Sequence, residues 1–120
     1  MESNVPKLDL APGEIYIGGT IAPDGKTTHV ILLPGDNDPA PWKAQMAWAK
    51  SIGGDLPTRV EQALLYANFK SEFKPRAYWS NEAYELESGW AWSQGFNLGS
   101  QYGTHQYDTL RARAVRRLII

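Results

Sequence analysis

The sequence contains no cysteine, and its 120 residues include only two histidines. Without cysteine the chain forms no disulfide, has no thiol nucleophile and supplies no thiolate to a metal. Two histidines without a metal-ligand spacing are too few for a histidine metal site. Stability must therefore come from packing, and the absence of cysteine is typical of a protein kept in a reducing compartment.

Long apolar runs and an excess of charge are also missing. No run approaches the roughly 20 residues needed to cross a bilayer, and the first residues lack the basic and apolar regions of a signal peptide. The formal net charge is −1, so no global field attracts a polyanion. We therefore expect a cytoplasmic or virion-associated protein with no signal peptide and no membrane insertion.

The motifs of common enzyme classes are absent as well. There is no Gly-x-Ser-x-Gly elbow of a hydrolase and no phosphate-binding P-loop. Glu82, Glu85 and Glu87 lie in a polar turn, where nothing is expected to desolvate them for acid–base chemistry. His29 falls in an apolar strand and is expected to be packed or paired. We therefore predict that the protein is not an enzyme and that it has no catalytic residue, metal ligand or cofactor.

What the chain does contain is enough apolar and aromatic material for one core. Hydrophobic residues make up 42% of the sequence and aromatic residues 12%, within the range of globular proteins. The length fits one domain. We expect an N-terminal arm over residues 1–13 and a single domain over residues 14–120.

The first half of this domain begins with a predicted β-hairpin. Residues 14–19 alternate between apolar and polar side chains, and residues 27–33 are β-branched and apolar. Pro23 and Gly25 supply the turn between them. Residues 34–41 contain three prolines, so we expect them to break the strand pattern rather than to continue it.

An oxygen-rich run within this breaker segment resembles part of a calcium-binding loop. Asp36, Asn37 and Asp38 provide side-chain oxygens, but no glutamate follows at the distance that a calcium loop requires. We therefore expect a loop that precedes and caps a helix.

Two helices are predicted next. The first begins near Pro41, ends at Gly53 and Gly54, and has an apolar stripe that includes Trp42 and Met46. The second begins with a capping box formed by Thr58 and Glu61, and fades near residues 68–71. Its expected apolar face consists of Val60, Ala63, Leu64 and Ala67.

The last third is predicted to be strands separated by polar segments. Residues 78–81 and 89–96 are strand candidates, residues 97–108 are read as a loop, and residues 110–120 as one closing strand. The order of elements indicates an α+β fold. Four arginines of the closing strand are expected to be solvated or ion-paired, with a nucleic-acid patch as the alternative: Arg111, Arg113, Arg116 and Arg117.

A series of short motifs occurs in a characteristic order over residues 40–118. These are Trp42 with Trp48 and Ala49, Gly53 to Thr58 with Glu61, Leu64 with Leu65, Tyr78 to Asn81, Ala91 with Trp92, Phe96 with Gly99, and Arg113 to Arg116. Their order and spacing resemble the Lcl C-terminal domain family, a family of unknown function that is common in phages and prophages.

The resemblance implies a C-type-lectin-like fold, related to that of formylglycine-generating enzymes. Two helices would pack on a small twisted antiparallel sheet with a long irregular loop. The sequence departs from the family at Asp55, where a basic residue is usual. The triplets of calcium-dependent lectins and the cysteines of formylglycine-generating enzymes are absent, so neither activity is implied.

The candidate site is the polar and aromatic segment of residues 94–107, together with one tryptophan before it. Tyrosine offers a large contact area, and amide side chains adapt their hydrogen bonds, which is the mixture found in binding loops. Trp79 and Trp92 are expected in the core. The candidate ligand-binding residues are Trp90, Gln94, Asn97, Gln101, Tyr102, His105, Gln106 and Tyr107.

These features predict a non-enzymatic binding module, encoded by a phage or prophage, that recognises a host receptor or another ligand. The alternative is an intracellular accessory protein that inhibits or modulates a host protein by direct contact. A structural subunit of an oligomer is a third hypothesis. The expected partner is a protein or a glycan rather than nucleic acid. The chain is expected to form a homo-oligomer or to attach to a larger assembly through residues 1–13.

Overall fold

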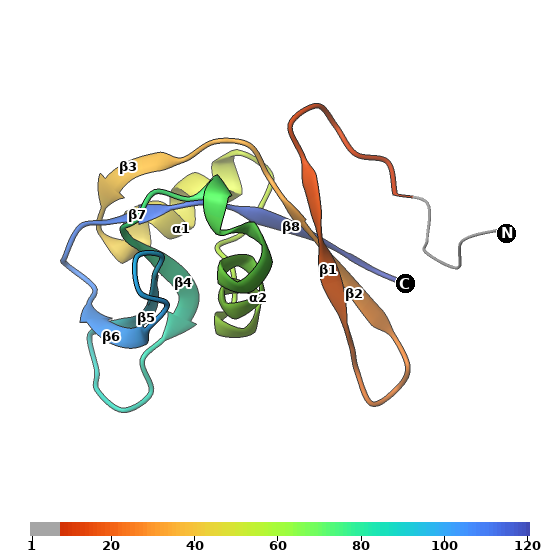
Figure 1. The fold of residues 1–120 in the computed structure, drawn as a ribbon. Helices are drawn as coiled ribbons and strands as arrows, with labels where there is room; N and C mark the ends of the chain where they lie inside the picture. Colours follow the sequence, from red (N-terminus) through yellow and green to blue (C-terminus); the bar gives the residue numbers. More distant parts are fainter. Residues whose placement is uncertain (1–7) are drawn as a thin grey trace, which may run out of the picture.

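The computed structural model describes residues 8–120 and shows two helices and two mostly antiparallel sheets, which confirms the α+β class (Figure 1). Residues 1–7 of the predicted arm lie outside the described part. In chain order the elements are β1 (Ile15–Ile21), β2 (Thr27–Leu32), β3 (Asn37–Ala40), α1 (Trp42–Ser51), α2 (Arg59–Phe69), the short 3₁₀ helix η1 (Lys70–Glu72), β4 (Ala77–Ala83), β5 (Trp90–Gly95), β6 (Gln101–His105), β7 (Leu110–Ala112) and β8 (Val115–Ile119).

One sheet has three strands in the order β1-β2-β8, and the other has five in the order β3-β7-β4-β5-β6. Among the strands of residues 8–120, β4 and β7 are the one pair that runs parallel. Helix α2 contacts β1 as well as β4 and β5, so it lies between the two sheets, whereas α1 packs against β3, β4 and β7 (Figure 1). Each helix therefore covers its own part of the core.

The predicted hairpin is confirmed, with β1 and β2 antiparallel and a register shift between Tyr16 and Gly18. Its inner face places Ile17, Val30 and Leu32 in a cluster with Leu65 of α2. On the outer face His29 is 5% exposed and its Nδ1 lies 2.8 Å from the Tyr16 hydroxyl oxygen, so this histidine is packed and paired as expected.

The breaker segment contains a strand that the sequence did not predict. Asn37 pairs with Ala112 and Ala40 with Leu110, with an irregularity between these two pairs. Pro39 is tolerated there because β3 is at the edge of the sheet, where a missing N–H leaves no partner unpaired. The prediction that residues 34–41 hold no strand was therefore wrong.

The capping box of α2 is confirmed. The Glu61 N–H donates to the Thr58 hydroxyl over 3.1 Å, and the Thr58 N–H donates to the Glu61 carboxylate over 2.9 Å. The predicted apolar face is wrong for Val60, Ala63 and Ala67, which are exposed, whereas Leu64 packs against the core as predicted. Val60 is 65% exposed, while Glu61 and Gln62 are buried. Hydrogen bonds explain this orientation of the helix, since the side-chain amide of Gln62 donates to the Tyr78 carbonyl and Glu61 accepts two bonds from Arg117.

Helix α1 packs through the predicted stripe, with Trp42 and Met46 partly buried and Ala49 fully buried. Pro41 is the residue before its first turn. The fully buried Gln45 was not foreseen. Its amide nitrogen donates to the carbonyls of Asp38 and Leu110, so this side chain joins the helix to β3 and to β7.

The closing segment forms two strands in different sheets rather than one. The chain leaves the five-stranded sheet after Ala112 and enters the three-stranded sheet at Val115. Between them, Arg113 donates to the carbonyls of Leu33 and Glu72 over 2.8 and 2.6 Å. This buried arginine adds side-chain bonds to the single backbone bond from the Leu33 N–H to the Ala114 carbonyl at the crossing. An alternating sequence pattern does not reveal such a crossing.

The arginines of this segment are engaged within the fold, which confirms the ion-paired interpretation. Arg116 pairs with Glu14 at 2.8 Å, and Arg117 pairs with Asp55 and Glu61 at 2.8 and 2.7 Å. Arg111 pairs at 2.7 Å with Asp36, which also accepts a hydrogen bond from the hydroxyl of Tyr78. Asp36 therefore belongs to an ion-pair network.

Replacing Thr58 with alanine is expected to lower the free energy of unfolding by about 1 kcal/mol, because the N-cap acceptor is lost. Urea denaturation of the variant measures this change. Thr109→Ala, at an exposed threonine outside the helices, is the control and should change the free energy by less than about 0.5 kcal/mol. Equal effects of the two substitutions would contradict the capping role.

Burial, reinforced by the hydrogen bond to Asp36, raises the pKa of Tyr78 to about 12. The neutral phenol is thus favoured in the folded state, and this contribution is present below pH 10 and lost as the pH rises towards 12. Urea denaturation at pH 8 and pH 11 should show a loss on the order of 1 kcal/mol beyond that of Tyr78→Phe, because pH 11 lies about one unit above the pKa of the unfolded state. Identical pH dependence of the two proteins would contradict the assignment.

Candidate binding surface

The register of β5 and β6 gathers aromatic side chains on one face of the five-stranded sheet. Trp90 pairs with His105, and Trp92 pairs with Gly103. Because alternate residues of a strand share a face, these positions lie on the same side. Two further rings contact this set, and the aromatic face is defined by Tyr84, Trp90, Trp92, His105 and Tyr107, with the guanidinium of Arg59 stacked on it.

Trp92 is the centre of one half of the aromatic face. The Arg59 guanidinium carbon lies 3.4 Å from the centroid of the Trp92 ring, and the Tyr84 ring centroid lies 4.6 Å away. The indole N–H donates to Glu85 over 2.9 Å, and this bond lowers the pKa of the Glu85 carboxyl. Trp92 is only half-buried, so its predicted place in the core is wrong, whereas Trp79 is fully buried as expected.

The neighbouring strand β6 lies within the segment predicted to be a loop, so that prediction is wrong for residues 101–105. Gly103 explains both the strand and its weak signal. A β-carbon at this glycine would lie 2.5 Å from the Tyr84 ring, so the bare backbone makes room for that ring. Glycine and polar residues at a sheet edge lack the apolar alternation by which strands are recognised.

The other half of the aromatic face is built around His105. Its ring centroid lies 5.7 Å from that of Trp90 and 5.2 Å from that of Tyr107. The Tyr107 N–H donates to Nδ1 of His105 over 3.2 Å. Tyr107 is 82% exposed, so a large ring projects from a backbone that the turn itself holds in place.

A cleft of about 510 Å³ lies beside Tyr107. Its walls come from the start of α1, the turn before β5 and the turn after β6, and include Trp42, Lys43, Ser88, Gly89, Gln106 and Tyr107. Gln106 fixes these walls, because its carbonyl accepts from the Trp42 N–H over 3.1 Å and its N–H donates to the Gly89 carbonyl over 2.9 Å. The cleft and the aromatic face share Tyr107 and form one continuous surface.

Four of the predicted site residues lie together on this surface: Trp90, His105, Gln106 and Tyr107. Tyr102 is 43% exposed but pairs with Ser93, which places it on the opposite face of β6. Gln94 is 1% exposed and donates to the Gly95 carbonyl, so its prediction as a ligand contact is wrong.

The remaining two predicted residues have local roles. The Asn97 side chain accepts from the N–H of Leu98 within its own turn. Gln101 accepts from the Arg59 side chain over 3.1 Å and donates to the Arg59 carbonyl over 2.7 Å. Gln101 therefore holds the arginine in position over Trp92 and does not extend the surface itself.

Sequence reasoning missed Arg59, Tyr84, Trp92, Trp42 and Lys43 as members of the surface. The spacing of Trp90 and Trp92, two residues apart in a strand, was a usable signal for Trp92. The other four residues come from the two helix starts and from the end of β4. Only the tertiary fold brings them to this strand.

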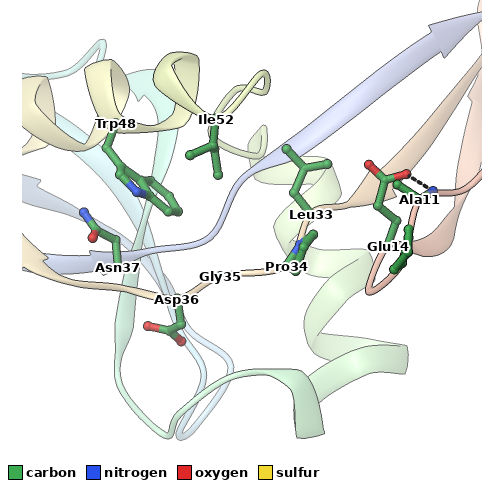
Figure 2. A pocket seen from close by; sticks show the side chains of 10 residues that line it. Ala11, Glu14, Leu33, Pro34, Gly35, Asp36, Asn37, Trp48 and Ile52 are labelled. Carbon is green, nitrogen blue, oxygen red and sulfur yellow. Dashed lines mark hydrogen bonds between the residues drawn. The ribbon is translucent and has the colours of Figure 1, made fainter.

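A second concave region of about 430 Å³ lies between α1 and residues 11–14 (Figure 2). Trp48 and Ile52 of α1 line one side, and Figure 2 shows Glu14 and Asp36 at other positions of its rim. Both carboxylates already bind arginines, and Arg116 holds the pKa of Glu14 below its usual value. This region therefore offers fewer unengaged polar groups for a ligand than the surface around Tyr107.

Within residues 8–120, no group of three or more acidic or histidine side chains is arranged to hold a metal ion. In that same part of the chain, no helix combines the length and the apolar character needed to cross a membrane. In comparisons with known proteins, the chain matches no protein-family model and no curated protein.

The contact between Gly103 and Tyr84 gives a direct test of the aromatic face. Gly103→Ala is expected to lower the free energy of unfolding by about 1–3 kcal/mol, because the new methyl group overlaps the Tyr84 ring. In a Tyr84→Ala background most of this cost should disappear, since the two positions are in contact. Chemical denaturation of the two single variants and the double variant measures the coupling, and strictly additive effects would contradict the packing.

Proposed function

We propose that this chain is a non-enzymatic binding module that holds its ligand on the aromatic face and in the adjoining cleft. The observation that supports this most is the exposed Tyr107 ring, which contacts His105 in a tilted arrangement and lines a cleft with hydrogen-bonded walls. Aromatic rings give large contact areas for little loss of side-chain entropy. Rings that are already fixed in place before the ligand binds lower the entropic cost of association further.

The polar groups of the surface favour binding over catalysis. Nδ1 of His105 accepts a hydrogen bond from the backbone and is not available as a base. Glu85 keeps its charge, because the bond from Trp92 lowers the pKa of this carboxyl, and a carboxylate with a low pKa is a poor general acid. The guanidinium of Arg59 lies over the Trp92 ring and donates a hydrogen bond to the Gln101 side chain.

The proposed ligand is a protein segment or a glycan of a host cell. The surface combines rings with amide and hydroxyl groups of Gln106, Ser88 and Tyr107 and a single lysine, Lys43. Such a mixture suits a largely neutral partner with both apolar and hydrogen-bonding groups. A nucleic-acid ligand is disfavoured, because the clustered arginines of the closing segment are engaged by carboxylates and carbonyls within the fold.

A C-type-lectin-like fold, and with it a phage or prophage origin, is part of this proposal. This proposal is supported by the order of the short motifs along the chain and by the contacts that their residues make in the fold. Trp79 fills the core, Thr58 and Glu61 cap α2, and Arg113 joins the two sheets. The module would then recognise a host receptor from the virion.

An accessory role inside the host is the second candidate, and it is favoured by an exposed leucine in the turn after β4. Leu86 is 74% exposed in this turn, which begins at Tyr84 of the aromatic face. An exposed leucine in a turn next to a cluster of aromatic rings is typical of a protein–protein contact. In this role the module would block or modulate a host protein.

The test begins with a glycan array and a pull-down from host lysate, followed by titration of the identified ligand with purified protein. Tyr107→Ala is expected to raise the dissociation constant by about 10–30-fold, the usual cost of removing an aromatic anchor. Tyr102→Ala is the matched control, because this tyrosine is also exposed but lies on the face of β6 opposite to His105. The dissociation constant of this variant should stay within about twofold of the wild-type value.

Two results would contradict the proposal. One is a blank glycan array together with a pull-down that yields no stoichiometric partner. The other is an affinity that falls equally with Tyr102→Ala and Tyr107→Ala. A glycan hit alone would favour the receptor-binding role, and a single host protein the accessory role.

A further inference from the structure

Strand β1 forms an edge of the three-stranded sheet, and beyond the irregularity between Tyr16 and Gly18 its end carries no charge and no proline that would prevent edge-to-edge pairing. Its sequence from Ile15 to Ile21 contains no charged residue and no proline. Its last three residues, Gly19, Thr20 and Ile21, are exposed. Natural edge strands are commonly protected by lysine, by proline or by a covering segment. Among residues 8–120, no other strand pairs with the outer side of this end.

The hydrogen bonds of the hairpin show which backbone groups face outward. The Ala22 N–H donates to the Lys26 carbonyl across the turn, and Thr27 exchanges two bonds with Ile120 on the other side of β2. Since bonding direction alternates along a strand, Thr20 is bonded to β2. The N–H and C=O groups of Gly19 and Ile21 therefore point away from the sheet.

The other sheet edges are less suited to pairing. The edge of β8 is closed at Val115, which exchanges two 2.8 Å bonds with Asp55. Strand β3 contains Asp38 and Pro39, and β6 is limited to five residues. Among the described strands, β1 is thus the edge with the longest uncharged run.

We infer that two copies of this chain pair through β1, antiparallel and about a twofold axis at Thr20. In this register Gly19 of each copy lies opposite Ile21 of the other, so all four outward groups of these two residues are bonded across the axis. No like charges meet, because the strand is uncharged. The two three-stranded sheets become one six-stranded sheet.

The side chains on the outer face fit this register. At Gly19 a β-carbon would lie 3.0 Å from the Thr28 carbonyl oxygen and 3.2 Å from Cγ2 of Thr27, so this position keeps a bare backbone and presents no side chain on this face. Ile21 is 75% exposed and lies on the same face two residues further on. In the pair, Ile21 of one copy lies over the bare backbone at Gly19 of the other, and each isoleucine loses contact with water.

The interface is small, so the association must depend strongly on concentration. A short strand edge buries much less than the roughly 1,200 Å² at the lower end of standard interfaces. The inference does not rest on the proposed binding function. Figure 1 shows β1 on the side of the molecule away from β5 and β6, so pairing would leave both aromatic faces accessible.

The mass of the protein in solution tests the inference. Light scattering after gel filtration, over loading concentrations up to about 1 mM, a range in which weak complexes form, should show a rise from 13.4 kDa towards twice that value. Ile21→Lys should keep the protein monomeric, because it brings a charge to the paired edge. Leu86→Lys is the matched control, since Leu86 is 74% exposed and Ile21 75%, and it should still dimerise.

A monomeric wild-type protein over the whole range overturns the inference. So does an Ile21→Lys protein that dimerises as strongly as the wild type, or an assembly that grows beyond two copies. Circular dichroism identical to that of the wild type establishes that the lysine variants are folded.

The absence of native cysteine allows the register itself to be tested. In the proposed pair, Thr20 of one copy lies directly opposite Thr20 of the other, at a position without backbone hydrogen bonds between the two residues. Their Cα atoms would be about 4.5 Å apart, a separation that a disulfide can span. Thr20→Cys should therefore form a covalent dimer under mild oxidation. Thr28→Cys, directly opposite Thr20 on β2, is the control, because three strand spacings of about 14 Å separate its two copies. Equal crosslinking of the two variants overturns the register.

Discussion

The crossing of the chain from β7 to β8 is the constraint on which the rest of the structure depends. Within four residues the backbone leaves one sheet and joins the other, and Ala112, Ala114 and Val115 are fully buried there. The only long side chain at the crossing, Arg113, satisfies the carbonyls of Leu33 and Glu72. Because buried backbone groups must find partners, this arginine makes an irregular crossing tolerable inside the core.

The aromatic face is held in place by elements that this crossing brings together. Strand β7 pairs with β4, and β4 pairs with β5, so the position of Trp90 and Trp92 follows from that of the closing segment. On the other side, Arg117 of β8 binds Glu61 at the start of α2, and this turn also bears Arg59. Both sheets thus position the same surface, one through strand pairing and the other through an ion pair.

Local signals in the sequence were sufficient for the parts of the fold that depend on local interactions. The hairpin, the capping box of α2 and the central strands were found because alternation and the Thr58–Glu61 spacing act within a few residues. The switch of sheets, the strand with Pro39 and the strand with Gly103 were missed, because each is stabilised by distant partners. The candidate site was found in part for the same reason: His105 and Tyr107 are close in sequence, whereas Arg59 reaches Trp92 only through the fold.

Native-state hydrogen exchange tests the joining of the two sheets most directly. The Leu33 N–H donates to the Ala114 carbonyl and the Val115 N–H to that of Asp55, while the Phe96 N–H, in the other half of the fold, donates to that of Arg76. If the crossing unites the sheets, these three amides exchange through one opening with the same free energy and the same dependence on denaturant. A lower opening free energy for Leu33 and Val115 than for Phe96 would show that the three-stranded sheet opens on its own, and would contradict the account.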